Sequence, residues 1–167
     1  MKKLILLLLF LPFLGLSQTS SITSLANFSE ADSNRAHVSV SGKAFELMSK
    51  IEADSIFDEQ LKKLASSIKG MDGYMGFTPS TAMQLVTNLE NSKAFEKYAE
   101  FSQKDNFLRF YIAEVDGVVS EMILIAYDKK EGYAGSVYGE MDIRDVGKLY
   151  KLVNMKGFDY LENHEKK

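Results

Sequence analysis

The sequence contains no cysteine among its 167 residues, and this absence excludes several classes of protein. Without thiols the chain has no disulfide, no thiol nucleophile, no cysteine-ligated zinc or iron–sulfur cluster, and no lipid-anchoring cysteine. Tryptophan is also absent, and there are only two prolines and two histidines. The histidines, His37 and His164, do not lie at the spacing of a metal-binding motif. We therefore expect no metal, no cofactor and no assigned catalytic residue.

Basic residues are in the minority. The chain has 20 Lys and Arg against 23 Asp and Glu, which gives a formal net charge of −3. Removal of an N-terminal leader containing Lys2 and Lys3 makes the remainder more acidic. Proteins that bind nucleic acid use a basic surface to neutralise phosphates. This balance of charge argues against a nucleic-acid partner.

The longest uncharged apolar run lies at the N-terminus. Two lysines precede an apolar stretch over residues 4–16, and Gly15 and Ser17 are small residues at the −3 and −1 positions of a cleavage site. This pattern predicts a signal peptide over residues 1–17 and a new N-terminus at Gln18. The run is shorter than the roughly 20 residues of a membrane span, so we expect no stable membrane insertion after cleavage. The predicted location is the periplasm or the extracellular space.

Composition divides the rest of the chain into three parts. Residues 18–34 are rich in Ser, Thr, Asn and Asp, which predicts a flexible N-terminal segment. Residues 35–154 carry alternating and helical apolar patterns, which predict a single α+β domain. Residues 155–167 form a polar C-terminal tail that also holds Phe158 and Tyr160. These two aromatic residues are expected to dock on the domain or to contact a partner.

Hydrophobic periodicity predicts the elements of the domain. The first half has a strand over 37–41, helices over about 44–51 and 54–68, a strand over 70–77 and a helix that begins at Thr78-Pro79. The spacing of Phe95, Tyr98 and Phe101 predicts a further helical face.

The C-terminal third predicts a three-stranded meander. Two β-rich runs, 107–115 and 118–127, are separated by Asp116-Gly117, which favours a type I′ turn. A third strand follows over 133–141, and Asp142 is placed to cap a last helix. The fold class is therefore α+β, with a mostly antiparallel sheet that includes the meander and with helices packed on one face.

Glu121 is the carboxylate that this pattern does not explain. It interrupts the apolar run 118–127, and alternation directs it inward if Ile123 and Ile125 point inward. Arg109, on the adjoining strand, is a candidate cross-strand partner. We favour a structural ion pair or an exposed charge over a functional acid at Glu121, because ion-pair networks perturb carboxylates as readily as active sites do.

Other motifs have simple structural explanations beside the functional ones. Tyr111 and Tyr138, with Tyr127 and Tyr133, form a candidate binding face on the meander, and cross-strand packing is the alternative. Ser66 and Lys69 have the spacing of penicillin-interacting enzymes, but the companion motifs are absent from the chain. Ser55 lies in a sequence that resembles an O-glycosylation sequon, but its position at a helix start favours an N-cap.

The C-terminal half resembles a known family. The segments 107–112, 116–125 and 137–143, with Glu121-Met122-Ile123-Leu124 and Gly139-Glu140-Met141-Asp142-Ile143 as their signatures, resemble the Bacteroidota envelope proteins called domain of unknown function 4252 (DUF4252). The resemblance extends over about residues 35–154. It implies an envelope-associated domain, often carried as a lipoprotein, whose activity is not assigned.

Three hypotheses for function follow. The first is a non-enzymatic module that binds an envelope protein through the meander or the C-terminal tail. The second is a carrier of a small apolar ligand, which requires an internal cavity between the sheet and the helices. The third is an envelope enzyme with a carboxylate site at Glu121 and Arg109, which requires Glu121 to line a pocket with convergent polar groups.

Overall fold

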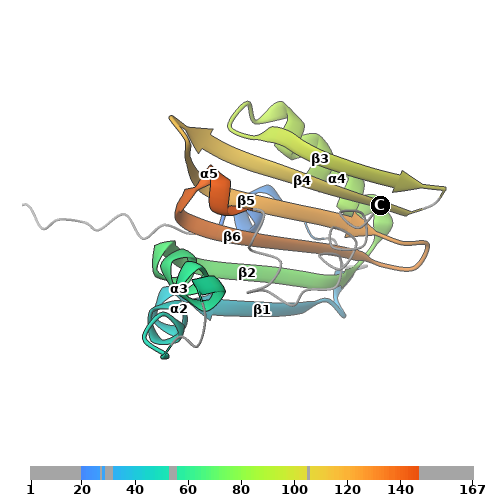
Figure 1. Cartoon of the computed structure of the whole chain (residues 1–167). Coiled ribbons are helices and arrows are strands. Elements are labelled where there is room, and N and C mark those ends of the chain that lie inside the picture. The colour runs from blue at the N-terminus through green and yellow to red at the C-terminus, as the bar shows by residue number, and fades with distance from the viewer. Residues whose placement is uncertain (1–19, 27, 29–31, 53–55, 105, 147–167) are drawn as a thin grey trace, which may run out of the picture.

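A computed structural model describes residues 20–26, 28, 32–52, 56–104 and 106–146. The chain folds into an α+β structure with one six-stranded antiparallel sheet, in which the strands are ordered β1-β2-β6-β5-β4-β3 (Figure 1). In chain order the elements are α1 (Ser21–Leu25), β1 (Ala36–Ser41), α2 (Gly42–Met48), α3 (Ile56–Ser67), β2 (Ile68–Phe77), α4 (Pro79–Asn91), β3 (Glu96–Gln103), β4 (Asn106–Val115), β5 (Val118–Tyr127), β6 (Gly132–Asp142) and α5 (Ile143–Val146).

The fold class and the meander predicted from the sequence are confirmed. Strands β4, β5 and β6 follow one another as antiparallel neighbours. Asp116 and Gly117, in the turn between β4 and β5, both have positive φ (53° and 82°), as a type I′ turn requires. Helix α4 begins as expected, with Pro79 in its first turn and the Thr78 side chain accepting a hydrogen bond from the backbone N–H of Thr81.

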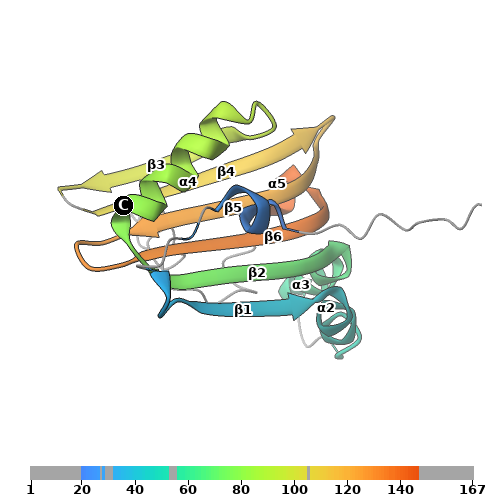
Figure 2. The ribbon, with the colours of Figure 1, turned by 180° about the vertical axis from the view of Figure 1, so that it is seen from behind.

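The helices pack on both faces of the sheet, which corrects the expectation of a single covered face. Helices α1 and α4 lie over one face, which we call the α4 face (Figure 2). Helices α2, α3 and α5 gather toward one end of the opposite face, which we call the α3 face (Figure 1). The physical reason is that the central strands are apolar on both sides, so each face has to be covered.

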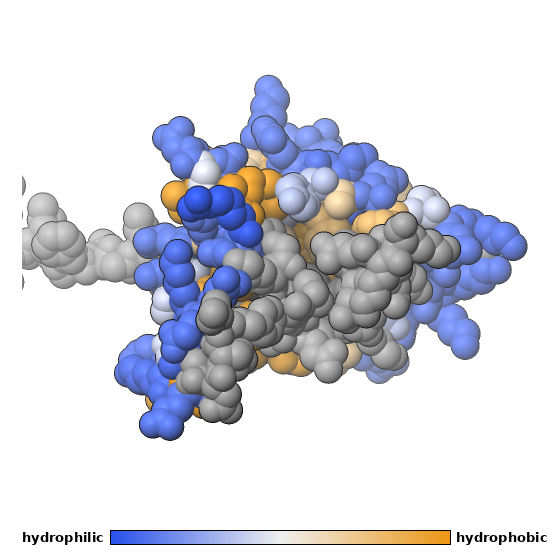
Figure 3. All heavy atoms as spheres, in the orientation of Figure 1, coloured by the Kyte–Doolittle hydropathy of each residue, from blue (hydrophilic) through white to orange (hydrophobic). Residues whose placement is uncertain are grey.

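Two separate hydrophobic clusters fill these faces. The cluster on the α4 face joins Ile22 of α1 and the apolar stripe of α4 to sheet residues Tyr74, Phe77, Phe107, Tyr111, Ile123, Ile125 and Ala134. The cluster on the α3 face joins Phe45 of α2 and Leu64 of α3 to sheet residues Ile68, Leu108, Phe110, Ile112, Val119, Met122, Leu124, Val137 and Met141. Coloured by hydropathy, the α3 face shows hydrophobic residues over the upper strands of the sheet between hydrophilic rims (Figure 3).

Residues of segment 18–34 that the structure describes include two that are buried against the sheet and its helices. Ile22 is fully buried in the cluster on the α4 face. Asp32 is also fully buried, and its carboxylate accepts hydrogen bonds from the backbone N–H of Thr78 (2.8 Å) and the hydroxyl of Thr81 (2.9 Å). Few apolar residues are enough to hold these positions, because the Asp32 carboxylate accepts hydrogen bonds from groups at the start of α4.

The predicted helical face at Phe95, Tyr98 and Phe101 is wrong, because residues 96–103 form strand β3. Ala99 and Phe101 alternate toward the α3 face, where both pack against the core, and Tyr98 is exposed. An edge strand with one partly buried side has a weak alternation, and here the three-residue spacing of aromatic residues hid it.

Two glycines allow the α3–β2 junction to pass close to neighbouring backbone. A Cβ atom at Gly139 of β6 would lie 2.1 Å from the carbonyl oxygen of Ser67. A Cβ atom at Gly42 would lie 2.5 Å from the carbonyl oxygen of Lys69. Since the obstructing atoms are backbone, neither site can accept a side chain without a shift of the main chain.

We therefore expect Gly139→Ala to destabilise the protein by about 1–3 kcal/mol, the usual range for overpacking. Chemical denaturation followed by far-UV circular dichroism measures the change. Glu140→Ala is the matched control, because Glu140 is exposed on the same strand and surface changes stay within about 0.5 kcal/mol. Equal stability of the two variants would show that the close approach at Gly139 does not exist.

Candidate functional site

Glu121 is buried on the α4 face. The register between β5 and β6 shifts between Val119 and Glu121. Beyond this irregularity Glu121 stands on the same side of β5 as Ile123 and Ile125, as the sequence predicted, and only 6% of the residue is exposed. A buried carboxylate is stable only when hydrogen-bond donors surround it.

The donors for Glu121 come from the start of α1 and from β6. The backbone N–H of Ser21 donates to Oε1 (2.9 Å), and the Ser21 hydroxyl donates to Oε2 (2.5 Å). The Ser136 hydroxyl of β6 also donates to Oε1, and the Ser20 hydroxyl lies 3.4 Å from the same atom. The carboxylate therefore joins the N-terminal helix to the middle of the sheet.

The same arrangement stabilises the first turn of α1. The Ser20 side chain caps the helix by accepting a hydrogen bond from the backbone N–H of Ile22 (3.3 Å). The negative charge of Glu121 lies at the positive end of the helix, where backbone N–H groups lack intrahelical partners. The Asn88 side chain on α4 donates to the carbonyl oxygen of Leu25 (2.8 Å), so both ends of α1 are fixed.

A polar row continues from Glu121 toward the β1 edge of the sheet. Tyr138 stands opposite Glu121 on β6, and a Cβ atom at Gly70 would lie 2.3 Å from its hydroxyl oxygen. Burial raises the pKa of Tyr138, and the carboxylates of Asp72 and Glu121 raise it further. His37 Nε2 lies 3.2 Å from Oδ1 of Asp72, and the His37 ring stacks on Tyr74.

Arg109 does not pair with Glu121, which corrects the cross-strand hypothesis. In the β4–β5 register Arg109 stands opposite Ile125, and Glu121 stands opposite Ala113. The two residues share a face of the sheet but are four positions apart, about 13 Å at the usual rise of a strand. Correct strand assignment was therefore insufficient, because pairing depends on register.

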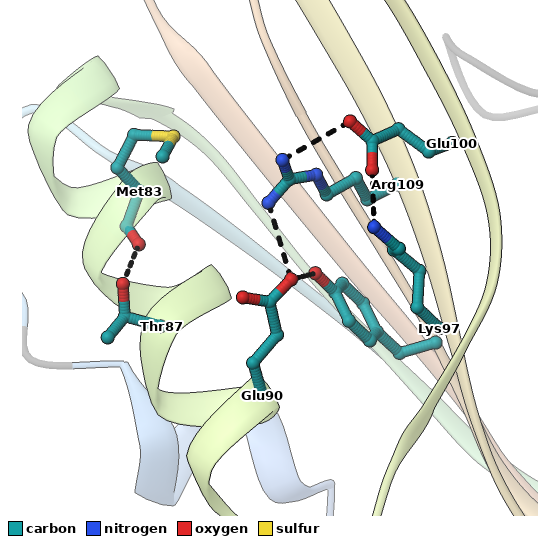
Figure 4. Close-up of polar contacts among 7 residues, drawn as sticks. Met83, Thr87, Glu90, Lys97, Glu100 and Arg109 are labelled. Carbon is teal, nitrogen blue, oxygen red and sulfur yellow. Dashed lines mark hydrogen bonds and ion pairs between the residues drawn. The ribbon is translucent and has the colours of Figure 1, made fainter.

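Arg109 belongs to a second polar network, which joins α4, β3 and β4 (Figure 4). Its guanidinium lies 3.5 Å from Glu90 of α4 and 3.2 Å from Glu100 of β3. The Tyr111 hydroxyl donates to the same Oε1 of Glu90 (3.0 Å). Lys97 completes the network through an ion pair with Glu100 (2.7 Å). The network fixes α4 and the edge strand to the sheet.

The tyrosines of the meander do not form one binding face. Tyr111 is 1% exposed in the cluster on the α4 face. Tyr127 packs edge-on against Phe107 in the same cluster, whereas Tyr133 stands on the other side of the sheet, opposite Ala126. Packing therefore explains most of the aromatic content. Phe158, Tyr160 and Ser55 lie outside the described residues.

The serines and Asp32 were not singled out from the sequence. Ser20 and Ser21 follow the predicted cleavage site and precede the apolar Ile22, so their only local signal was that of a helix N-cap. Nothing local marks Ser136 as a partner of Glu121, because that contact depends on the pairing of β5 with β6.

A cavity of about 500 Å³ lies at the end of the sheet near the β4–β5 turn. Its lining combines charged residues of α3, β6 and α5 with apolar ones, namely Lys63, Glu140, Asp142, Arg144 and Asp145 together with Leu64, Val118, Met141 and Ile143. Glu121 does not line this cavity. Within the described residues no group of three or more His, Asp or Glu is placed to hold a metal ion, and no helix is long and apolar enough to cross a membrane.

These features define an α+β domain built on an open six-stranded antiparallel sheet with a buried, fully hydrogen-bonded carboxylate. The chain belongs to the family described as Domain of unknown function (DUF4252), whose model matches residues 28–149. The match includes Glu121 and Ser136 but not the serines of α1. Comparisons with curated proteins and with solved structures find no match.

Loss of the Glu121 carboxylate should detach α1. We expect Glu121→Ala to lower the free energy of unfolding by about 2–3 kcal/mol, because it removes charged hydrogen bonds and leaves buried hydroxyl groups unpaired. Ser136→Ala should cost about 1 kcal/mol. Amide hydrogen exchange should accelerate in α1 more than in β4. Glu96→Ala, at an exposed glutamate of β3, is the control. An unchanged exchange rate in α1 of the Glu121→Ala variant would show that Glu121 does not hold this helix on the sheet.

The Tyr111 hydroxyl should lose its proton only at high pH. Burial raises the pKa of Tyr111 to about 12, and Glu90 contributes to the rise. The unfolded chain loses this proton near pH 10, so stability should fall as the pH rises from about 10 to about 12. The phenolate absorbance of the wild type minus that of Tyr111→Phe isolates this titration. In Glu90→Gln the midpoint should move down toward pH 10, whereas a wild-type midpoint near 10 would contradict the burial.

Proposed function

We propose that this protein is an exported domain of the bacterial cell envelope that acts by binding a partner rather than by catalysis. The N-terminal pattern of two lysines, an apolar run and a small-residue cleavage site supports export. The family resemblance extends the proposal to the envelope of Bacteroidota. Absence of a lipid-anchoring cysteine favours a chain that is released after cleavage.

The observation that carries the binding role is an exposed apolar surface at one edge of the sheet. Nine large hydrophobic side chains are exposed among the described residues, and five belong to β1, β2, α2 or the turn after α2. We call these five the edge surface: Val38, Leu47, Met48, Ile51 and Met75. Leu47 and Ile51 are 57% and 65% exposed. The five residues lie in two parts of this edge, with Leu47, Met48 and Ile51 on or after α2 and with Val38 and Met75 toward the start of β1. Exposed apolar groups on neighbouring elements are typical of interaction sites.

The two alternatives have less support. An enzyme that uses Glu121 needs a carboxylate open to substrate, but this one accepts hydrogen bonds from Ser21 and Ser136 and is buried. A carrier of an apolar ligand needs an apolar cavity between sheet and helices. On the α4 face that space is filled by side chains such as Leu85, Leu89 and Ile125, which are at most 1% exposed. The cavity beside α3 has apolar residues in its lining, but charged residues line it as well.

Export has a direct test. When the full chain is expressed in a Gram-negative host, we expect it in the periplasm with Gln18 as its first residue, as measured by intact mass and N-terminal sequencing. Leu8→Arg interrupts the apolar run and should leave an unprocessed chain in the cytoplasm. A wild-type chain that keeps Met1 would contradict the proposal.

The binding role is tested by photo-crosslinking in intact cells. A photoreactive phenylalanine analogue at Leu47 should give a crosslinked product of one defined mass. The matched control places the analogue at Val115, which is 73% exposed in the turn region at the far side of the sheet. Absence of a product specific to Leu47 would contradict the binding role.

A further inference from the structure

Strand β1 is an edge strand without the usual protection against pairing. Its sequence, Ala36–Ser41, contains no lysine, no carboxylate and no proline, and its register with β2 runs without a shift. Five of its six residues are exposed. Exposed edges normally carry charges, prolines or bulges, because their free N–H and C=O groups attract another strand.

The opposite edge shows that protection. Strand β3 carries Glu96, Lys97 and Glu100, and its register with β4 shifts between Lys97 and Ala99. Two edges of one sheet therefore differ in the features that control edge-to-edge pairing. The difference leaves β1 as the edge that is open to pairing with another strand.

The two sides of β1 have different chemistry. Val38 and Val40 stand opposite Gly73 and Met71 of β2 on the α3 face, and Val40 packs against the hydrophobic cluster there. His37, Ser39 and Ser41 stand on the α4 face. A partner strand must therefore offer apolar residues on one side and small polar residues on the other.

We infer that the partner is a second copy of this chain, paired antiparallel through β1 about a two-fold axis at Ser39. This inference deepens the proposed binding role and rests on it. An axis normal to the sheet keeps the two α3 faces on one side of a continuous twelve-stranded sheet. It sets Val38 of each copy opposite Val40 of the other, and His37 opposite Ser41.

Helix α2 explains why the edge surface extends beyond the strand. Phe45 packs α2 onto the α3 face, and the helix begins at Gly42 directly after β1. In this register Gly42 lies opposite Ala36 of the second copy. Each α2 is thereby brought toward the first half of the other β1, where Val38 and Met75 are exposed. The lysines near this contact, Lys43 and Lys50, are already paired with Glu46.

Cysteine substitution tests the axis, because the chain has no native cysteine. Residues on a two-fold axis between antiparallel strands have Cα atoms about 4.5–5.5 Å apart, within the range of a disulfide. We expect Ser39→Cys to form a covalent dimer about tenfold faster than Ser102→Cys, an exposed serine on the β3 edge, because pairing raises the local thiol concentration. Equal rates would overturn the inference.

Light scattering on the purified chain gives the second readout. The wild type should have twice the mass of one chain, and Val38→Lys should have the mass of a single chain with an unchanged circular dichroism spectrum, because the new charges face an apolar edge. Tyr98→Lys on β3 should stay dimeric.

A wild type with the mass of one chain would contradict dimer formation, and a dimer that Val38→Lys does not split would contradict pairing through β1. Either result would overturn the inference. The crosslink at Leu47 separates this failure from failure of the proposed function. A product of twice the chain mass supports the dimer. A product with another protein retains the binding role but rejects the second copy as its occupant, and no product rejects both.

Discussion

The buried carboxylate of Glu121 is the interaction on which the arrangement of the α4 face depends. A charge inside an apolar sheet face is tolerated only when donors surround it, and here three serines and a backbone N–H supply them. Two of those serines lie about a hundred residues earlier in the chain. The requirement to satisfy one carboxylate thus holds the N-terminal helix on the central strands, and Ile22 then completes the hydrophobic cluster beneath it.

Asp32 applies the same principle at a second position. Its buried carboxylate accepts hydrogen bonds at the start of α4, where Thr78 and Thr81 also meet. The polar segment before β1 is therefore fixed by buried acids that meet the starts of helices. These acids explain how Ile22 and Asp32, in a stretch with few apolar residues, are held in buried positions.

Local patterns in the sequence predicted those parts of the fold that depend on neighbours in the chain. The Asp116-Gly117 turn, the Thr78-Pro79 helix start and the meander were found because each depends on a few adjacent residues. Strand β3 was missed because its aromatic residues have helical spacing and only one of its sides is partly buried. An edge strand that is only partly buried on one side needs few apolar residues, so the alternation of apolar and polar residues along it is weak.

The candidate site was predicted only in part, because its contacts are distant in sequence. Alternation correctly placed Glu121 inward, but its assignment to Arg109 neglected the register of β4 on β5. With Val115 opposite Val118 at the turn, a regular hairpin sets Arg109 opposite Leu124, and the one-residue irregularity moves it only to Ile125. The donors at Ser20, Ser21 and Ser136 reach Glu121 only after α1, β5 and β6 have come together in the fold. Composition alone does not encode such contacts, even when every element is assigned correctly.

The strand order has a consequence for the timing of folding. Strand β2 is paired with β1 on one side and with β6, the last strand made, on the other. During synthesis the first half of the chain has no partner for that second side of β2 until residue 142 has emerged. Contacts between distant segments slow folding, and here they delay closure of the sheet until almost the whole domain exists. In a chain built this way, one side of β2 stays unpaired until synthesis of the domain is almost complete.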